Sequence, residues 1–193
     1  MTRLAIFASG GGSNAEAIIQ YFKDHDSISV ELIVSNRESA YVLQRAEDHS
    51  ISSQLITKRQ FSDKNHVLDI LKDSSIDYIV LAGFLLLIPK YLIEAFPDRI
   101  LNIHPALLPK YGGKGMYGHH VHKAVHQNNE KESGMTIHLV DEHYDEGKIL
   151  FQATTVLEAS DSPDMIAAKV LKLEHRHYPE QIEKLILSQH KDQ

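Results

Sequence analysis

A polar pair at the end of an apolar run has the residue types and spacing for catalysis. Asn102 and His104 flank Ile103, and Pro105 follows directly. Residues two apart in a strand share a face, so the amide and the imidazole are expected to point into one crevice. Both groups can donate hydrogen bonds to an oxygen that becomes negative, which suits an acyl-type transfer. The alternative is a purely structural histidine.

An acidic loop could supply the charge that such a histidine needs. Asp145 lies within residues 141–147, a segment rich in carboxylates. A carboxylate close to His104 would raise the pKa of the imidazole and favour its protonated form. The alternative is a solvated acidic turn, because Asp141, Glu142 and Glu146 are equally acidic neighbours.

A glycine-rich turn, Ser9-Gly10-Gly11-Gly12-Ser13-Asn14, separates an apolar run from a helical pattern. Backbone N–H groups at the start of a helix bind phosphate well, and glycine lets the phosphate approach closely. The turn matches neither a nucleotide P-loop nor a dinucleotide fingerprint, because no lysine follows it and Ser35-Asn36 ends the next apolar run. The turn therefore indicates a site for a single phosphate monoester. The alternative is a tight turn without a ligand.

Two further groups of residues have weaker indications. His119, His122 and His126 are spaced by three and four residues, which places them on one helical face. Such spacing can bind a metal, although a polar helix face or the wall of a site is the favoured interpretation. Glu174 lies near the end of a predicted helix, where a negative charge is unfavourable. It indicates either a bound amine or a salt bridge.

The composition is that of an ordinary globular protein. The 193 residues have 42% hydrophobic and 24% charged side chains, a net charge of -6 and no cysteine. The acidic balance argues against nucleic acid or a membrane surface as a partner. The absence of cysteine excludes disulfides and thiolate nucleophiles. The longest apolar run, residues 78–89, is too short to span a membrane. We therefore expect a cytoplasmic enzyme.

The first hundred residues alternate short β-rich runs with helical patterns. Strands are expected at residues 4–8, 30–34, 54–57, 78–84 and 100–103, and helices at 15–23, 41–48, 62–72 and 89–96. This alternation predicts an α/β fold with a doubly wound, Rossmann-like, mostly parallel sheet. Ligands of such sheets bind beyond the carboxyl ends of the strands, where the glycine turn, Gly83-Phe84 and residues 102–109 all fall.

The last third of the sequence changes character. Runs at 135–140 and 149–156 predict an antiparallel C-terminal hairpin around the acidic loop. A helix is expected to start near Pro163, to break at Pro179 and to be followed by a second, short helix. We expect one domain, residues 1–193, with a phosphate-binding half at about 1–100 and a catalytic half at about 101–193.

Taken together, these segments resemble the folate-dependent formyltransferase superfamily. Within it, they are most similar to the phosphoribosylglycinamide formyltransferases, also called glycinamide ribonucleotide transformylases, of purine synthesis. The resemblance covers roughly residues 3–187. It rests on the glycine turn, residues 81–84, the segment 101–110 with its His-Pro-Ala-Leu-Leu-Pro core, residues 134–140, Asp145 with Gly147, and Glu174-His175 with Tyr178-Pro179.

The resemblance implies transfer of a formyl group from 10-formyltetrahydrofolate to the amine of N1-(5-phosphoribosyl)glycinamide. Asn102 and protonated His104 would stabilise the oxyanion, and Asp145 would keep His104 charged. The implied binding residues are Gly11, Gly12, Ser13 and Asn14 for the phosphate, Glu174 for the glycinamide, and Lys64, Leu85, Leu86, Leu87, Ile88, Asn102, Val140, Asp141 and Asp145 for the folate. No metal is implied, the partners are small molecules, and the chain would be a monomer or a homodimer.

Three positions depart from the pattern of the family. Leu86 stands where some relatives carry arginine. Lys64 stands where relatives have a basic folate contact; it keeps the positive charge but not the bidentate fork. Residues 111–120 form a longer loop that is richer in glycine and histidine. The substrate contacts of this loop therefore cannot be carried over from the family.

Other functions stay open at this point. A formyltetrahydrofolate hydrolase would send the same formyl group to water, and another formyltransferase of the superfamily would send it to a different amine. A Rossmann-like nucleotide-binding module without catalysis would account for the glycine turn and the sheet. It would not account for Asn102, His104 and Asp145 at one expected crevice.

Overall fold

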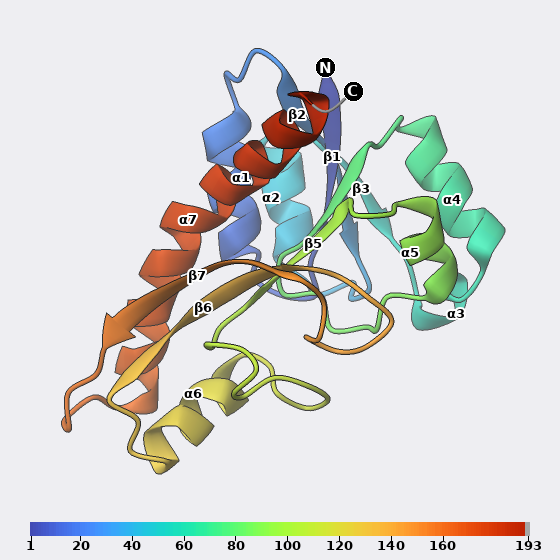
Figure 1. Ribbon diagram of the computed structural model, residues 1–193. Coiled ribbons are helices and arrows are strands. Elements are labelled where there is room, and N and C mark those ends of the chain that lie inside the picture. Colours follow the sequence, from blue (N-terminus) through green and yellow to red (C-terminus); the bar gives the residue numbers. More distant parts are fainter. Residues whose placement is uncertain (192–193) are drawn as a thin grey trace.

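A seven-stranded sheet forms the centre of the computed structural model, which describes residues 1–191 (Figure 1). The elements follow in the order β1 (Thr2–Phe7), α1 (Ser13–Phe22), β2 (Ile28–Ser35), α2 (Val42–Asp48), β3 (Ser52–Leu55), α3 (Lys58–Phe61), α4 (Lys64–Asp73), β4 (Tyr78–Leu81), α5 (Lys90–Ala95), β5 (Ile100–His104), α6 (His119–Gln127), β6 (Glu132–Leu139), β7 (Ile149–Val156) and α7 (Pro163–Lys191). The strand order across the sheet is β3-β2-β1-β4-β5-β6-β7.

The direction of the strands confirms the predicted fold class. β3, β2, β1, β4 and β5 run parallel to one another, and β6 and β7 continue the sheet antiparallel. β1 and β4 are almost fully buried because helices cover both faces of the sheet. The chain reverses its winding after β3, so the carboxyl ends of β1 and β4 lie at a topological switch point, where such sheets bind ligands.

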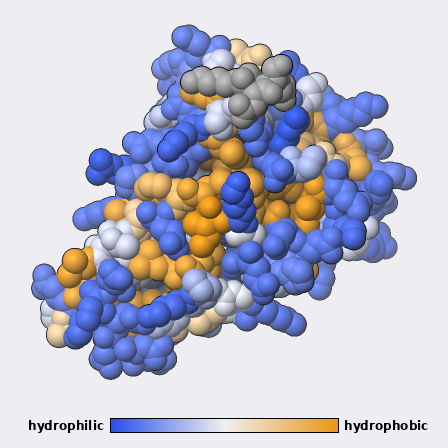
Figure 2. All heavy atoms as spheres, viewed as in Figure 1, coloured by the Kyte–Doolittle hydropathy of each residue, from blue (hydrophilic) through white to orange (hydrophobic). Residues whose placement is uncertain are grey.

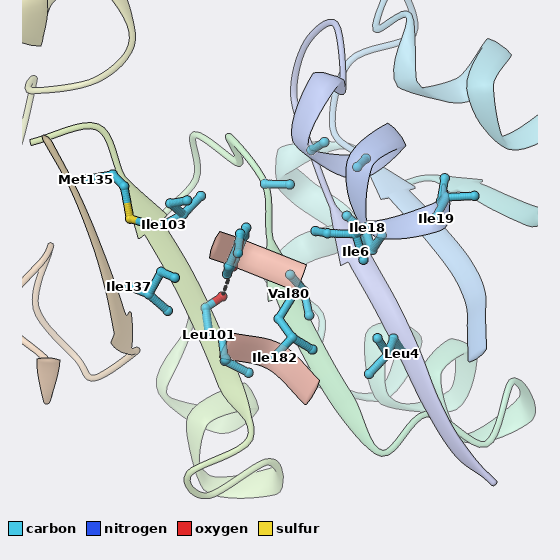
Figure 3. Packing of buried hydrophobic residues seen from close by; sticks show 14 of the residues in the cluster. Leu4, Ile6, Ile18, Ile19, Val80, Leu101, Ile103, Met135, Ile137 and Ile182 are labelled. Carbon is cyan, nitrogen blue, oxygen red and sulfur yellow. Dashed lines mark hydrogen bonds between the residues drawn. The ribbon is translucent and has the colours of Figure 1, made fainter. Parts of the chain in front are cut away.

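Two hydrophobic layers fix the helices on the sheet. One layer contains α1, α2, α6 and α7, and the other contains α3, α4 and α5. In Figure 1 the two sets of helices lie on opposite sides of the central strands. Figure 3 shows part of the first layer, in which Ile18 of α1 and Ile182 of α7 meet strand residues such as Ile6 and Leu101.

The helix break that the sequence predicts at Pro179 is wrong. α7 runs without interruption from Pro163 to Lys191 and contains Pro179 in its interior. Proline removes one helical hydrogen bond and usually costs about 3 kcal/mol there. Helix α7 buries Ile166, Val170, Tyr178 and Ile182 against the sheet on both sides of the proline. This continuous burial outweighs the local penalty.

The other boundaries differ by a few residues from the sequence prediction. The expected helix at 62–72 begins at Lys64, where the Asp63 side chain accepts from the N–H groups of Asn65 and His66. The short helix α3 was not predicted, because its four residues rest on a local capping box between Thr57 and Gln60. Within residues 1–191, none of the helices combines the length and apolar character that a membrane span requires.

Candidate active site

A cavity of about 930 Å³ lies at the carboxyl ends of β4 and β5. Its walls come from both halves of the chain, because Asn14 of α1 and Glu174 of α7 line it together with Asn102 and His104 of β5. Figure 2 shows apolar side chains gathered across the middle of one face of the molecule, between more polar regions. A site of this size and mixed lining is typical of small-molecule binding.

The structure brings most of the sequence-predicted site residues to this cavity. Those that line it are Asn14, Leu85, Leu86, Leu87, Ile88, Asn102, His104, Val140, Asp145 and Glu174. Gly11, Gly12 and Ser13 precede Asn14 in the turn and are not among the lining residues, and neither are Asp141 and Lys64. Lys64 is an exposed residue at the start of α4.

Four polar side chains meet at the end of β5. His104 Nδ1 lies 3.5 Å from Asp145 Oδ2, and Asn102 Nδ2 lies 3.4 Å from Asp145 Oδ1. Asn102 also pairs with His138, because β5 and β6 place them opposite each other in the antiparallel register. The distance from Asn102 Nδ2 to His138 Nε2 is 3.1 Å. These contacts bring two donors and one carboxylate to a single wall of the cavity.

The carbonyl partners fix which ring nitrogens carry protons. His138 Nδ1 lies 2.9 Å from the carbonyl of Leu139, so Nδ1 is the donor and Nε2 accepts from Asn102. His104 Nε2 lies 2.7 Å from the carbonyl of Tyr111 and therefore also donates. The neutral form of His104 keeps its lone pair on Nδ1, the nitrogen that faces Asp145.

Burial controls the charge of this histidine. Burial lowers the pKa of His104, and it outweighs the opposite effects of the Asp145 carboxylate and the Tyr111 carbonyl. Asp145 favours the imidazolium, as the sequence predicts, but without substrate the net pKa of His104 lies below its ordinary value. Burial raises the pKa of Asp145, yet the nearby His104 imidazole and the N–H of Gly113 hold that pKa below its usual range.

A second polar group lies at the α7 side of the cavity. Glu174 is only 7% exposed, and its Oε2 accepts from Asn14 Nδ2 at 2.7 Å. Burial raises the pKa of Glu174 to about 7, although the hydrogen bond from Asn14 lowers it. Asn14 Oδ1 is buried and has no hydrogen-bond partner among the residues that the structure describes. The pair therefore presents acceptors to a ligand that carries N–H or O–H groups.

The glycine turn packs closely against α2. Gly12 has φ 69°, and a Cβ atom there would lie 2.6 Å from Val42. Arg45 of α2 donates from Nε to the carbonyl of Gly11 at 2.8 Å. Among the residues that the structure describes, no side chain caps the N-terminus of α1, so its first N–H groups are available for an anion.

The three histidines of α6 have different surroundings. His119 and His122 both line the cavity, but only His122 is buried. His119 Nδ1 lies 3.6 Å from Asp164 Oδ1, and His126 is exposed. Within residues 1–191 there is no group of three or more His, Asp or Glu side chains placed to hold a metal ion. Among the described residues, the three side chains therefore do not form a common metal site.

Two contacts of the Asn102 and His104 pair were not predicted from the sequence, although His138 could be recognised there as a core or pocket histidine. His138 reaches Asn102 only through the pairing of β5 with β6, which no local pattern reveals. The carbonyl of Tyr111 reaches His104 because Tyr111 has φ 58°. Neither the strand register nor a left-handed tyrosine can be deduced from the residue types.

Known proteins with similar sequences agree with these observations. The sequence model of the Formyl transferase family matches residues 2–182. A phosphoribosylglycinamide formyltransferase of Bacillus subtilis is 34% identical over 96% of this chain and 95% of its own length. A chloroplastic phosphoribosylglycinamide formyltransferase of Arabidopsis thaliana is 44% identical over 92% of this chain. The chain spans 63% of the length of that relative and 60% of a similar one from Vigna unguiculata.

Solved structures share the fold along nearly the whole chain. A phosphoribosylglycinamide formyltransferase from Bacillus halodurans has a TM-score of 0.87 and 37% identity, covering 96% of this chain and 95% of its own. A glycinamide ribonucleotide transformylase from Geobacillus kaustophilus has a TM-score of 0.87 and 32% identity, with 96% and 98% covered.

Proposed function

Because the chain belongs to the formyl transferase family, we propose that it formylates the amine of N1-(5-phosphoribosyl)glycinamide with 10-formyltetrahydrofolate. The products would be the N-formyl compound and tetrahydrofolate, in de novo purine synthesis. One observation carries the proposal: a single cavity joins the Asn102, His104 and Asp145 cluster to the acceptor pair Asn14 and Glu174. The names of the relatives support the same activity.

The chemistry follows from the groups at the end of β5. The substrate amine attacks the formyl carbon, and the carbonyl oxygen becomes an oxyanion that accepts from Asn102 Nδ2 and from protonated His104. When the bond from the formyl carbon to N10 breaks, the proton that the amine loses reaches N10, relayed by a water at Asp145. Fixed donors in a buried site stabilise such an oxyanion strongly. The arrangement of the two substrates supplies much of the remaining acceleration.

The binding roles divide the cavity into two ends. Asn14, which the resemblance assigns to the phosphate, donates to Glu174, so we place both residues at the glycinamide end of the acceptor. The N–H groups of the glycine turn would hold its phosphate. Residues 85–88 and Val140 would enclose the pterin with apolar side chains and backbone groups. Lys64 and Asp141, outside the cavity lining, stay predictions as folate contacts.

We further propose a single domain in which the first half binds phosphate and the second half binds folate and carries the catalytic groups. The proposed reaction requires neither a metal ion nor a nucleophilic side chain. The partners would be these small molecules, in a monomer or a homodimer. A cytoplasmic location stays a prediction; the names of the two plant relatives place those proteins in the chloroplast.

Release of tetrahydrofolate tests the proposal. The protein is mixed with 10-formyltetrahydrofolate, with and without the phosphoribosylglycinamide acceptor, and release is followed spectroscopically. We expect release only with the acceptor, and a loss of about 10²- to 10³-fold in kcat for Asn102→Ala and for His104→Ala. His126→Ala, an exposed substitution on α6, serves as the control.

Other outcomes would contradict the proposal. Release of tetrahydrofolate at the same rate with and without the acceptor would indicate a hydrolase. An absence of release with both substrates would indicate another acceptor or a binding module. Full activity of both alanine variants would remove the catalytic role of the β5 pair.

A further inference from the structure

The short segment that follows the β5 turn holds both members of the His104 and Asp145 pair through its backbone. The carbonyl of Tyr111 accepts from His104 Nε2 at 2.7 Å, and the N–H of Gly113 donates to Asp145 Oδ2 at 2.9 Å. Gly112, which lies between these two residues, is also close to Asp145, because a Cβ atom on Gly112 would lie 3.4 Å from the Cβ atom of Asp145. The orientation of both catalytic groups thus depends on the path of residues 111–113.

Tyr111 has a backbone conformation that needs outside support. Its φ of 58° lies in the left-handed region, which a residue with a bulky side chain rarely adopts. Such a conformation persists only when the surroundings fix it. The support therefore has to come from the tyrosine side chain or from its neighbours.

The side chain of Tyr111 is anchored outside the cavity. Its hydroxyl donates to Glu130 Oε1 at 2.8 Å and accepts from Asn128 Nδ2 at 2.8 Å. Glu130 also accepts from Lys110 Nζ at 3.1 Å. Asn128 is the C-cap of α6, and Glu130 lies between α6 and β6, so the anchor belongs to a different element from the catalytic strand.

We propose that Tyr111 is a positioning residue, whose hydroxyl, held by Glu130 and Asn128, keeps its carbonyl on His104 Nε2 and thereby directs His104 Nδ1 to the reacting oxygen. The inference rests on the proposed formyl transfer. With Nε2 committed to the carbonyl, the second proton of the imidazolium can only be at Nδ1. Loss of the anchor would let the imidazole turn or exchange its tautomer.

Loss of the Tyr111 carbonyl from His104 would also change the pH at which His104 is protonated. The groups that face His104 are the Asp145 carboxylate, the His138 and His122 imidazoles and the Tyr111 carbonyl. Burial lowers the pKa of His104, and the carbonyl is one of the two groups that raise it. If the carbonyl moves away, the pKa of His104 falls further and protonation requires a lower pH.

The test is Tyr111→Phe, which removes only the hydroxyl. We expect kcat to fall about fivefold, equivalent to one ordinary hydrogen bond, with the KM values of both substrates changed less than twofold. The NMR titration of the His104 ring should shift to lower pH. Tyr21→Phe is the matched control, because Tyr21 also donates to a glutamate, Glu183 Oε2 at 2.6 Å, in an exposed pair outside the cavity.

Two further variants complete the design. Glu130→Gln keeps an acceptor oxygen and should retain most of kcat, whereas Glu130→Ala should resemble Tyr111→Phe. If Tyr111→Phe fails to fold, Asn128→Ala takes its place, because it removes one bond to the hydroxyl from an exposed position.

Two results would overturn the inference: an unchanged His104 titration and kcat in Tyr111→Phe, or the same losses in Tyr21→Phe. The titration needs no substrate. It therefore tests the positioning of His104 even if the wild-type protein transfers no formyl group, and the two failures can be told apart.

Discussion

Burial of Glu174 is expected to make the stability of the protein depend on pH. The Glu174 pKa of about 7 lies above its ordinary value of 4.5 because the folded protein buries it. The protonated form is thus favoured by folding, and stability is lost as the pH rises from about 4.5 through 7. Glu174→Gln keeps an acceptor for Asn14 and cannot ionise. It should stabilise the ligand-free protein at pH 8 by up to roughly 3 kcal/mol, and not at pH 4.

Thermal unfolding of both proteins at pH 4 and pH 8 measures this effect. The same substitution should weaken binding of the amine acceptor, because it removes the charge that pairs with a protonated amine. A difference in Tm that is equal at both pH values would contradict the buried-acid explanation. The role of Glu174 would then have to rest on the binding measurement alone.

Prediction of individual residues from the sequence succeeds where the geometry is local. Asn102 and His104 share a face because they are two apart in a strand, and that periodicity is visible in the sequence. His138 and the Tyr111 carbonyl depend on strand pairing and on a left-handed backbone. Such contacts are set by tertiary structure, so residue types alone do not reveal them.

At the scale of elements, α2 forms the support behind the glycine turn. Val42 N–H donates to the Gly10 carbonyl at 3.1 Å, and Arg45 holds the Gly11 carbonyl. Arg45 also pairs at 2.8 Å with Glu16, a carboxylate in the first turn of α1 that would otherwise repel a bound phosphate. We therefore expect Arg45→Met to raise the KM of the phosphorylated acceptor about three- to tenfold and to leave the KM of the folate unchanged.

Steady-state kinetics with the phosphorylated acceptor and with its dephosphorylated riboside measure this prediction. The effect should be confined to the phosphorylated acceptor. In the double variant that combines Arg45→Met with Glu16→Gln, partial recovery of the KM for the phosphorylated acceptor would indicate that Arg45 acts by neutralising Glu16. No recovery would indicate that the bond to Gly11 matters. An unchanged KM in Arg45→Met would exclude both roles.

The elements themselves were largely predictable because burial and periodicity decide them. The parallel strands β1 and β4 appear as continuous apolar runs, and the hairpin β6 and β7 appears as two runs around an acidic loop. The wrong prediction of a helix break at Pro179 has the opposite cause. A rule about local hydrogen bonds predicted a break, but burial along the whole of α7 overrides it.

At the scale of the whole molecule, α7 connects the two halves of the cavity. It carries Glu174 to Asn14 of α1 and, one turn later, buries Tyr178 completely. The Tyr178 hydroxyl lies 3.0 Å from the carbonyl of Leu81 in β4 and 3.2 Å from that of Leu101 in β5. Figure 3 shows the hydrogen bond at the Leu101 carbonyl. The cavity thus depends on how α7 sits on the sheet.

Tyr178→Phe tests whether the position of α7 on the sheet controls the cavity. The variant removes the hydroxyl proton that the carbonyls of Leu81 and Leu101 share, and should lose about 1 to 3 kcal/mol of stability. Because Glu174 on α7 and Asn102 on β5 would shift relative to each other, the KM of the amine should rise and kcat should fall. Tyr78→Phe is the matched control, because Tyr78 also ties the sheet to α7, through Gln189 at 2.6 Å. Tyr78 is the first residue of β4, at the opposite end of that strand from the cavity. Equal losses of activity at equal losses of Tm in both variants would mean that α7 only stabilises the fold.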